Sequence, residues 1–337
     1  MFIGRKKLCK LFFLILLVFA SCTSKKKADL NIYTYSSFAG HYGPGPDLVK
    51  IFEQDCHCTV NMIDAGDAGT LLQRLVLEKN LPADLVVGLD QLSLEKAQSV
   101  IQWQSIKFEK VKWSPLLPDN SKLTEFLPYD YAPLTFIYRK GEIEPPTQFE
   151  DFKKPEYHKS MAFQDPRTST PGLQMLLWMA KPVEKDQFRG YLKSLMPSVK
   201  KLSPSWSASY GYFQQKKVKL VFSYVTSLVY HWKQKNQEMY QGAVFPNGHP
   251  VQIEYFGIPK SCRHCDLAKR FAALMLSPQG QKLIAEKNYM LPVTDEVKLD
   301  PVFSRLPKLK ILPLDYTRSL MAEKNFYIDQ WYAAIHK

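Results

Sequence analysis

The run LPYDYAPLTFIYRK at residues 127–140 decides the fold of this chain. It is rich in aromatic and other β-favouring side chains, and it opens a new strand-rich passage after a first series of strands and helices. A second such run, VQIEYFGIPK at residues 251–260, could carry the chain back. Because the two runs join two sets of alternating strands and helices, the sequence predicts an α/β protein of two lobes with a ligand cleft between them.

Strands and helices alternate on both sides of this run, as expected for mainly parallel sheets flanked by helices. Before it, apolar patterns predict strands at residues 30–37, 59–64 and 83–90 and helices at residues 47–55 and 70–79. After it, they predict strands at residues 160–166 and 218–227 and helices at residues 172–181, 227–236, 266–276 and 278–287.

The same reading divides the chain into segments. The first lobe is predicted to hold residues 30–127 plus 250–295, and the second lobe residues 128–249. Residues 296–337 are predicted to form a C-terminal helical segment that packs across the lobes.

The N-terminus has the layout of a secretory signal, with a basic start, the apolar run LFFLILLVFA and small residues before a cysteine. The apolar run is too short to span a bilayer comfortably. The pattern predicts a bacterial lipoprotein signal peptide at residues 1–21, lipidation of Cys22 and a polar linker at residues 22–29; the alternative is ordinary cleavage near Ala20. One lipid plus the basic TSKKK tail would tether the protein to a membrane surface.

The positive charge of the chain does not predict a nucleic-acid partner. Removal of residues 1–21 takes away four basic residues and lowers the formal net charge from +13 to +9. The remaining lysines are scattered, often in pairs such as Lys216 and Lys217, without a basic stripe interleaved with aromatic residues.

Four cysteines of the mature chain could form disulfides in an oxidising compartment. Cys262 and Cys265 could pair locally, whereas Cys56 and Cys58 could pair only as a small strained ring unless they bridge elsewhere. A four-cysteine zinc site is the other interpretation, although the spacing of Cys56 and Cys58 is wrong for the usual two-residue gap.

Polar and aromatic residues gather at the predicted strand ends, where ligands bind in open parallel sheets. Tyr35, Asp67 and Tyr224 each follow such a strand, and so does the loop QDPRTSTPGL at residues 164–173. Thr170 before Pro171 predicts a helix N-cap whose free amides could bind an anion. In that loop Asp165, Arg167 and Ser169 could also face the cleft. Aromatic rings with one carboxylate suit a flat organic cation.

Several stretches, taken in order over most of residues 30–300, resemble the periplasmic thiamine-binding proteins of bacterial ABC importers. They are IYTYSSFAGHYGPGP, FEQDCHC, DAGTLLQRL, ADLVVGLD, PYDYAPLTFIY, QDPRTSTPGLQMLLWM, WSASYGYF and LVFSYVTSLVYH. The resemblance implies a type II periplasmic-binding-protein fold that closes over thiamine or its mono- or diphosphate. It further implies delivery to an inner-membrane ABC permease with its ATPase, and a periplasmic location with the N-terminal lipid in the membrane.

The resemblance also implies a set of ligand-binding residues. The positions that match the family's ligand contacts are Tyr35, Asp67, Ser169, Trp206, Tyr224 and Tyr230. Tyr42 and Tyr289 stand where the family tends to have tryptophan, which gives less stacking area. The hydroxyls of Thr168, Ser169 and Thr170 could take the hydroxyethyl end of thiamine or a phosphate. No catalytic residue, cofactor or metal is expected.

Two other functions fit the same general fold. A thiamine-degrading transferase would need a nucleophilic cysteine at the cleft, but Cys56 and Cys58 precede a predicted strand and so lie at its far end. A ferric-ion binder would use tyrosinates, but Tyr224 and Tyr230 are six residues apart and lack an obvious set of partner ligands.

Overall fold

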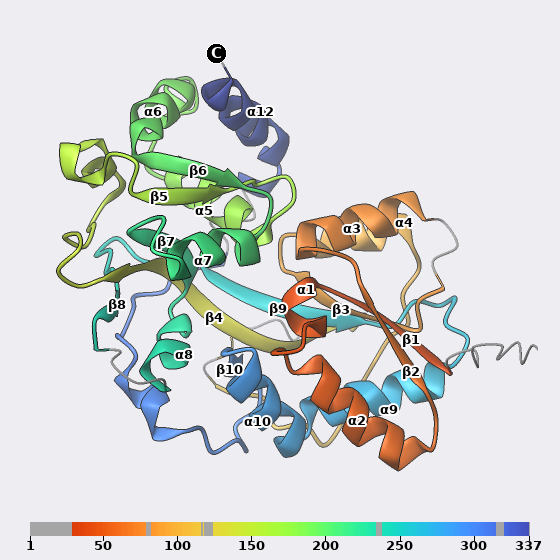
Figure 1. Cartoon of the computed structure of the whole chain (residues 1–337). Helices are drawn as coiled ribbons and strands as arrows, with labels where there is room; N and C mark the ends of the chain where they lie inside the picture. The colour runs from red at the N-terminus through yellow and green to blue at the C-terminus, as the bar shows by residue number, and fades with distance from the viewer. Residues whose placement is uncertain are drawn as a thin grey trace, which may run out of the picture.

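A computed structural model of the chain describes residues 29–78, 82–115, 117, 124–233, 238–314 and 320–336 (Figure 1). The predicted signal peptide and the predicted lipidation site Cys22 lie outside these residues. None of the described helices is long and apolar enough to cross a membrane.

Two lobes lie side by side, each with its own cluster of buried apolar side chains (Figure 1). The first lobe is built from β1 (Leu30–Thr34), α1 (Ser36–Ala39), α2 (Gly45–Cys56), β2 (Val60–Asp64), α3 (Ala68–Leu77), β3 (Leu85–Asp90), α4 (Leu94–Val100), β9 (Val251–Gly257), α9 (Cys265–Leu276), α10 (Pro278–Lys287) and β10 (Leu291–Pro292).

The second lobe is built from β5 (Met161–Gln164), α5 (Thr170–Ala180), α6 (Phe188–Leu195), β6 (Val199–Ser203), α7 (Trp206–Gln214), β7 (Leu220–Tyr224), α8 (Ser227–Lys233), β8 (Tyr240–Gly242) and α12 (Lys324–Ile335). Short 3-10 helices lie at Phe149–Lys153, Pro155–Tyr157, Met196–Ser198 and Pro301–Arg305.

One long strand, β4 (Phe126–Arg139), belongs to both lobes. Its first half pairs antiparallel with β9, from Phe126 opposite Gly257 to Pro133 opposite Val251. Its second half pairs antiparallel with β7, beginning at Leu134 opposite Tyr224. The predicted crossing at residues 127–140 is therefore confirmed.

The strand order is β2-β1-β3-β9-β4-β7-β5-β6, with β8 and β10 also paired to β4. The outer strands of each lobe run parallel, as the alternating pattern predicted, while β9 and β4 run antiparallel to their neighbours. In parallel sheets the carboxyl ends of the strands meet at one edge, so the ends of β1, β5 and β7 are all brought toward the space between the lobes. The two-lobed α/β prediction is confirmed.

The C-terminal helix α12 packs on α5 and α6 of the second lobe. It covers α5, all of whose side chains are buried, so this mainly apolar helix is buried on every side rather than amphipathic. Leu314, further back in the chain, packs against the core of the first lobe. The domain boundaries drawn from the sequence stay a prediction.

Both cysteine pairs form local disulfides, Cys56 with Cys58 and Cys262 with Cys265. The sequence left open which cysteines pair with each other, and the structure shows that each pairs with its near neighbour in the chain. Within the described residues, no group of three or more His, Cys, Asp and Glu side chains is placed to hold a metal ion.

The start of α5 differs by one residue from the prediction. Ser169 occupies the N-cap position and Thr170 is already the first helical residue, with Pro171 in the first turn. Sequence patterns gave no helix at α1, α4, α6 or α7 and no strand at β6, β8 or β10, and the strand predicted at residues 30–37 ends at Thr34, before α1 begins at Ser36. In α7 the aromatic residues face both the core and the cleft, so its apolar pattern is not one-sided.

His249 lies where β4 passes from one lobe to the other, and it predicts a pH effect on stability. Its Nδ1–H donates to the Leu134 carbonyl, and its Nε2 accepts the Phe245 amide. Burial lowers the pKa of His249 to about 4. A second ring proton would also face the Phe245 N–H, so the charged ring has no acceptor on that side. The neutral ring therefore stabilises the fold above the unfolded-state pKa, and this contribution is lost as the pH falls toward about 4.

We expect His249→Gln, which keeps one donor and one acceptor but does not titrate, to unfold with a flatter pH profile. Relative to this variant, the wild type should lose about 1–3 kcal/mol of unfolding free energy between neutral pH and about pH 4. Urea denaturation at a series of pH values measures the difference. Parallel profiles for the two proteins would contradict this role of His249.

Candidate functional site

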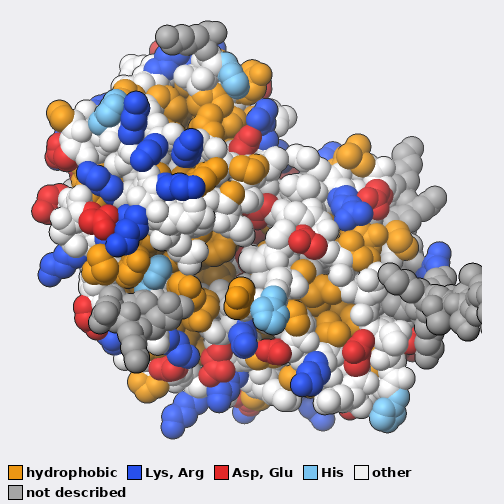
Figure 2. Space-filling model, in the orientation of Figure 1, with side chains coloured by type: hydrophobic (Ala, Val, Ile, Leu, Met, Phe, Trp, Pro, Cys, Tyr) orange, Lys and Arg blue, Asp and Glu red, His pale blue; other side chains and the backbone are white. Residues whose placement is uncertain are grey.

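A cavity of about 770 Å³ lies between the two lobes, a size typical of small-molecule sites. The face of the molecule shown in Figure 2 is hollowed at this junction, and hydrophobic side chains gather there. Eight of the ten ligand-binding residues predicted from the sequence line this cavity: Tyr35, Tyr42, Asp67, Thr170, Trp206, Tyr224, Tyr230 and Tyr289.

Asp67 joins the lobes through the starts of two helices. It is the N-cap of α3 in the first lobe, where its carboxylate accepts the Ala68 amide at 3.0 Å. Its other oxygen accepts the Trp206 amide, the first residue of α7 in the second lobe, also at 3.0 Å. Burial raises the pKa of Asp67, whereas hydrogen bonds from Trp206, Ser169 and Ala68 lower it. Asp67 is thus both a helix cap and a contact between the lobes.

Aromatic rings from both lobes form much of the cavity wall. Trp206 stacks on Tyr210 with ring centroids 5.0 Å apart and lies 6.0 Å from the ring of Tyr224. The Trp206 indole N–H donates to Ser223 Oγ, which fixes the ring plane. Tyr230 of the second lobe meets Tyr289 of the first lobe edge to face at 5.5 Å. Such rings offer negative faces to a cation.

Tyr42 differs from the other rings because it is 85% exposed. It lies at the mouth of the cavity and meets His41 edge to face at 5.1 Å. A ligand in the cavity could bury this ring.

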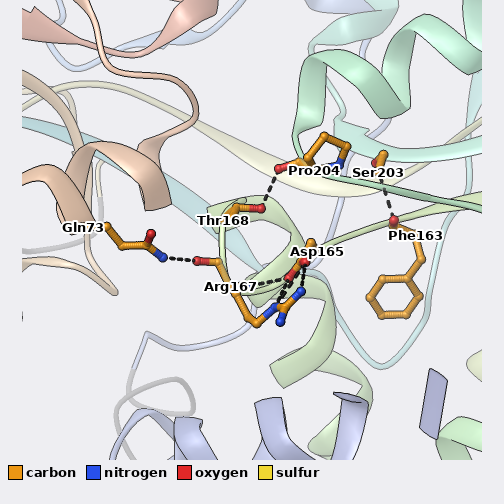
Figure 3. Close-up of polar contacts among 7 residues, drawn as sticks. All are labelled: Gln73, Phe163, Asp165, Arg167, Thr168, Ser203 and Pro204. Atoms are coloured by element: carbon orange, nitrogen blue, oxygen red, sulfur yellow. Dashed lines mark hydrogen bonds and ion pairs between the residues drawn. The ribbon is translucent and has the colours of Figure 1, made fainter. Parts of the chain in front are cut away.

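The loop before α5 forms hydrogen bonds within itself and to neighbouring segments of the chain (Figure 3). Asp165 forms an ion pair with Arg167, whose guanidinium also lies over the rings of Trp331 and Tyr332 in α12. The Thr168 hydroxyl donates to the Pro204 carbonyl. The residues that line the cavity do not include Asp165, Arg167 or Thr168. Their bonds explain why so many polar groups gather in QDPRTSTPGL: they hold the loop.

The end of this loop does reach the site. Ser169 is buried, and its single hydroxyl hydrogen can be donated either to Gln164 Oε1, at 3.3 Å, or to Asp67. Thr170 and Pro171 line the cavity at the N-terminus of α5, where unpaired backbone amides favour an anion or a carbonyl oxygen.

The loop also carries a direct contact between the lobes. Gln73 of α3 donates from Nε2 to the Arg167 carbonyl at 3.0 Å (Figure 3). One turn earlier, Gly69 lies so close to Thr168 that a Cβ there would be 2.5 Å from the Thr168 carbonyl oxygen. Only glycine allows the two lobes to approach this closely.

Sequence patterns missed the most heavily hydrogen-bonded group of the site, Glu254. This buried carboxylate on β9 lines the cavity and accepts the hydroxyls of Tyr35 at 2.6 Å, Tyr129 at 2.7 Å and Tyr224 at 3.3 Å. Burial raises the pKa of Glu254, and these hydrogen bonds lower it. A signal was present: Gln252 and Glu254 are the polar residues of the otherwise apolar strand VQIEYFG, and their spacing of two puts them on one face.

A second buried carboxyl, Asp130, neighbours Glu254. Burial and the charge of Glu254 raise the pKa of Asp130 well above its usual range. The hydrogen bonds favour the negative charge on Glu254 rather than on Asp130, because Glu254 accepts four of them whereas the Asp130 carboxyl accepts one from Asn288. Lys287 also lines the cavity, but its ammonium pairs with Asp47 at 3.4 Å. The cavity thus favours a ligand with positive charge.

Comparisons with known proteins agree with this geometry. The sequence model described as "bacterial extracellular solute-binding protein" matches residues 47–311. The chain belongs to this solute-binding protein family. It is 34% identical over 330 residues to the thiamine-binding periplasmic protein of Salmonella typhimurium, covering 96% of this chain and 99% of that protein. It is 35% identical over 316 residues to the Brucella abortus protein of the same name, covering 92% and 93%.

Solved structures give the same picture of this solute-binding protein. A periplasmic thiamin binding protein superposes with a TM-score of 0.81 at 32% identity, covering 91% of this chain and 96% of that one. The ferric binding protein from Campylobacter jejuni superposes with a TM-score of 0.71 at 21% identity, covering 90% and 99%, which shows a shared fold.

The Gly69 contact predicts the effect of one added methyl group. We expect Gly69→Ala to hold the lobes further apart, because its Cβ would meet the Thr168 carbonyl. Small-angle X-ray scattering with saturating thiamine should give a larger radius of gyration than for the wild type under the same condition, because only lobes in contact bring Gly69 against Thr168. Gly190→Ala is the matched control, since a Cβ at this α6 position meets open space. Equal scattering from all three proteins would contradict the prediction.

Proposed function

We propose that this solute-binding protein captures thiamine, or its mono- or diphosphate, in the cavity between its lobes. The observation that carries the proposal is the half-buried Asp67 carboxylate beside the Trp206 and Tyr224 rings, with both lobes contributing. The names of its relatives and of its structural neighbour support the same ligand.

The chemistry of thiamine suits this cavity. Its thiazolium ring carries a permanent positive charge, which aromatic faces and a carboxylate stabilise by roughly 0.5–2 kcal/mol for each ring contact. The N-terminus of α5 at Thr170 and Pro171 would receive the hydroxyethyl end or a phosphate. Thr168 and Ser169 would act by holding that loop and Asp67 in place.

The bound ligand would be delivered to a membrane permease driven by an ATPase. A ligand held by both lobes favours their closure by its differential affinity for the closed state, and closure creates the surface that a permease could recognise. The protein would work in the periplasm, attached to a membrane through lipidated Cys22; this residue lies outside the described part of the chain.

Two observations weigh against the other functions. Burial and the charge of Glu254 raise the pKa of Tyr224 well above its ordinary value, which disfavours the tyrosinate that a ferric ion would need. The four described cysteines are all paired in disulfides, so none of them offers the thiolate of a thiamine-degrading transferase.

We expect Trp206→Ala to weaken thiamine binding at least about tenfold, because it removes the largest ring face beside Asp67. The matched control is Trp232→Ala, which removes an indole of the same lobe whose N–H donates to the Tyr240 carbonyl and which does not line the cavity. Isothermal titration calorimetry compares the two variants with the wild type. Equal affinities for Trp206→Ala and the wild type would count against this site.

Native mass spectrometry of the protein purified from cells tests the identity of the ligand. The expected spectrum shows a fraction of the protein with one added mass equal to thiamine or one of its phosphates. Gentle unfolding should release that molecule. A different trapped mass, or failure of added thiamine to bind the stripped protein, would contradict the proposal.

A further inference from the structure

The hydroxyl groups near Glu254 have a fixed direction. An ionised carboxylate only accepts hydrogen bonds, so each hydroxyl that meets it must donate its single hydrogen. Tyr35 and Tyr129 donate to Glu254 Oε2, and Tyr224 donates to Glu254 Oε1. Asn288 then donates to the Tyr35 oxygen at 2.9 Å. Glu254 thereby sets the polarity of every hydroxyl around it.

The same rule fixes the orientation of the Gln252 side-chain amide. Its Nε2 donates to Glu254 Oε1 at 3.1 Å and to the Tyr224 oxygen at 2.8 Å. The reverse orientation of the amide would place its carbonyl oxygen against the carboxylate. Its Oε1 is buried, and it has no hydrogen-bond partner among the residues that the structure describes.

The Tyr224 oxygen has one lone pair that no described residue uses. A phenol has one hydrogen and two lone pairs. The hydrogen is used by Glu254 and one lone pair by Gln252, so one lone pair is left on an atom whose side chain lines the cavity. Each oxygen of Glu254 already accepts two hydrogen bonds from the described residues, which leaves the carboxylate little capacity for a ligand. The remaining hydrogen-bonding capacity at this end of the cavity is that of an acceptor.

We propose that Glu254 is a positioning residue that makes Tyr224 an obligatory hydrogen-bond acceptor, so that the site selects a ligand with an N–H donor at that point. The inference rests on the proposed function, where the donor would be the exocyclic amine of the aminopyrimidine ring. A ligand with a carbonyl oxygen in the same place would meet the Tyr224 lone pair and be rejected. Ring stacking and the Asp67 charge alone would not distinguish these two ligands.

The test compares thiamine with its 4-oxo analogue, in which the pyrimidine amine is replaced by a carbonyl oxygen. Both molecules keep the thiazolium charge and the ring area. We expect the wild type to bind thiamine at least about tenfold more tightly in calorimetry, since a site built to pair with an N–H strongly disfavours an analogue that lacks it. Tyr224→Phe should reduce this preference to within about threefold of equality.

Two more variants distinguish a positioning role of Glu254 from a role in packing alone. Glu254→Gln keeps the size of the side chain, but its amide can donate to the tyrosine oxygens, so the preference for thiamine should fall as in Tyr224→Phe. Tyr230→Phe is the control: it removes another hydroxyl from the cavity wall, one that accepts from Gln214 at 3.4 Å and does not contact Glu254, and it should keep the preference whatever its affinity.

The outcomes divide as follows. A wild type that binds thiamine tightly but binds the 4-oxo analogue equally well overturns this inference and leaves the proposed function standing. Full preference retained by Tyr224→Phe also overturns it. A wild type that does not bind thiamine overturns the proposed function and this inference together. Should Glu254→Gln fail to fold, as judged by circular dichroism, Tyr224→Phe still decides the question.

Discussion

The contact between the two lobes depends in part on the carboxylate of Asp67, which accepts backbone amides at the starts of α3 and α7. One acceptor thus satisfies helix ends that belong to different lobes. Asp67 is only half-buried, and both hydrogen bonds and a nearby positive charge stabilise its ionised form, so we expect it to favour the state in which both amides and a cation are present. We propose that charge recognition and lobe closure both depend on this side chain.

Different parts of the cavity offer different chemical groups to a ligand. At one end the N-terminus of α5 offers amides, in the middle Trp206 and Tyr224 offer ring faces beside Asp67, and at the other end Glu254 leaves only acceptors. Sites for an anion, a cation and a hydrogen-bond donor, in that order, suit a ligand that is itself polar at both ends and charged in the middle. The long strand β4 makes this order possible because it holds the two lobes in register.

Much of the fold followed from the sequence because the signals were local. The β-rich run at residues 127–140 and the helix at residues 278–287 show their periodicity within one element, and α10 has the predicted bounds. The eight cavity residues were found because they follow strands or match a family pattern. Glu254 was missed because its role comes from three tyrosines that are far apart in the chain, and Thr168 was misplaced because its partner, Pro204, lies in another loop.

The central claim is that a cation between Asp67 and the rings closes the lobes. The most direct measurement is the distance between nitroxide labels at two exposed positions, Leu77→Cys on α3 and Leu202→Cys on β6, by pulsed electron spin resonance. Thiamine should shorten and narrow the distance distribution in the otherwise native chain and leave it broad when Asp67 is asparagine. Closure of both proteins to the same extent, or no change in either, would contradict the account.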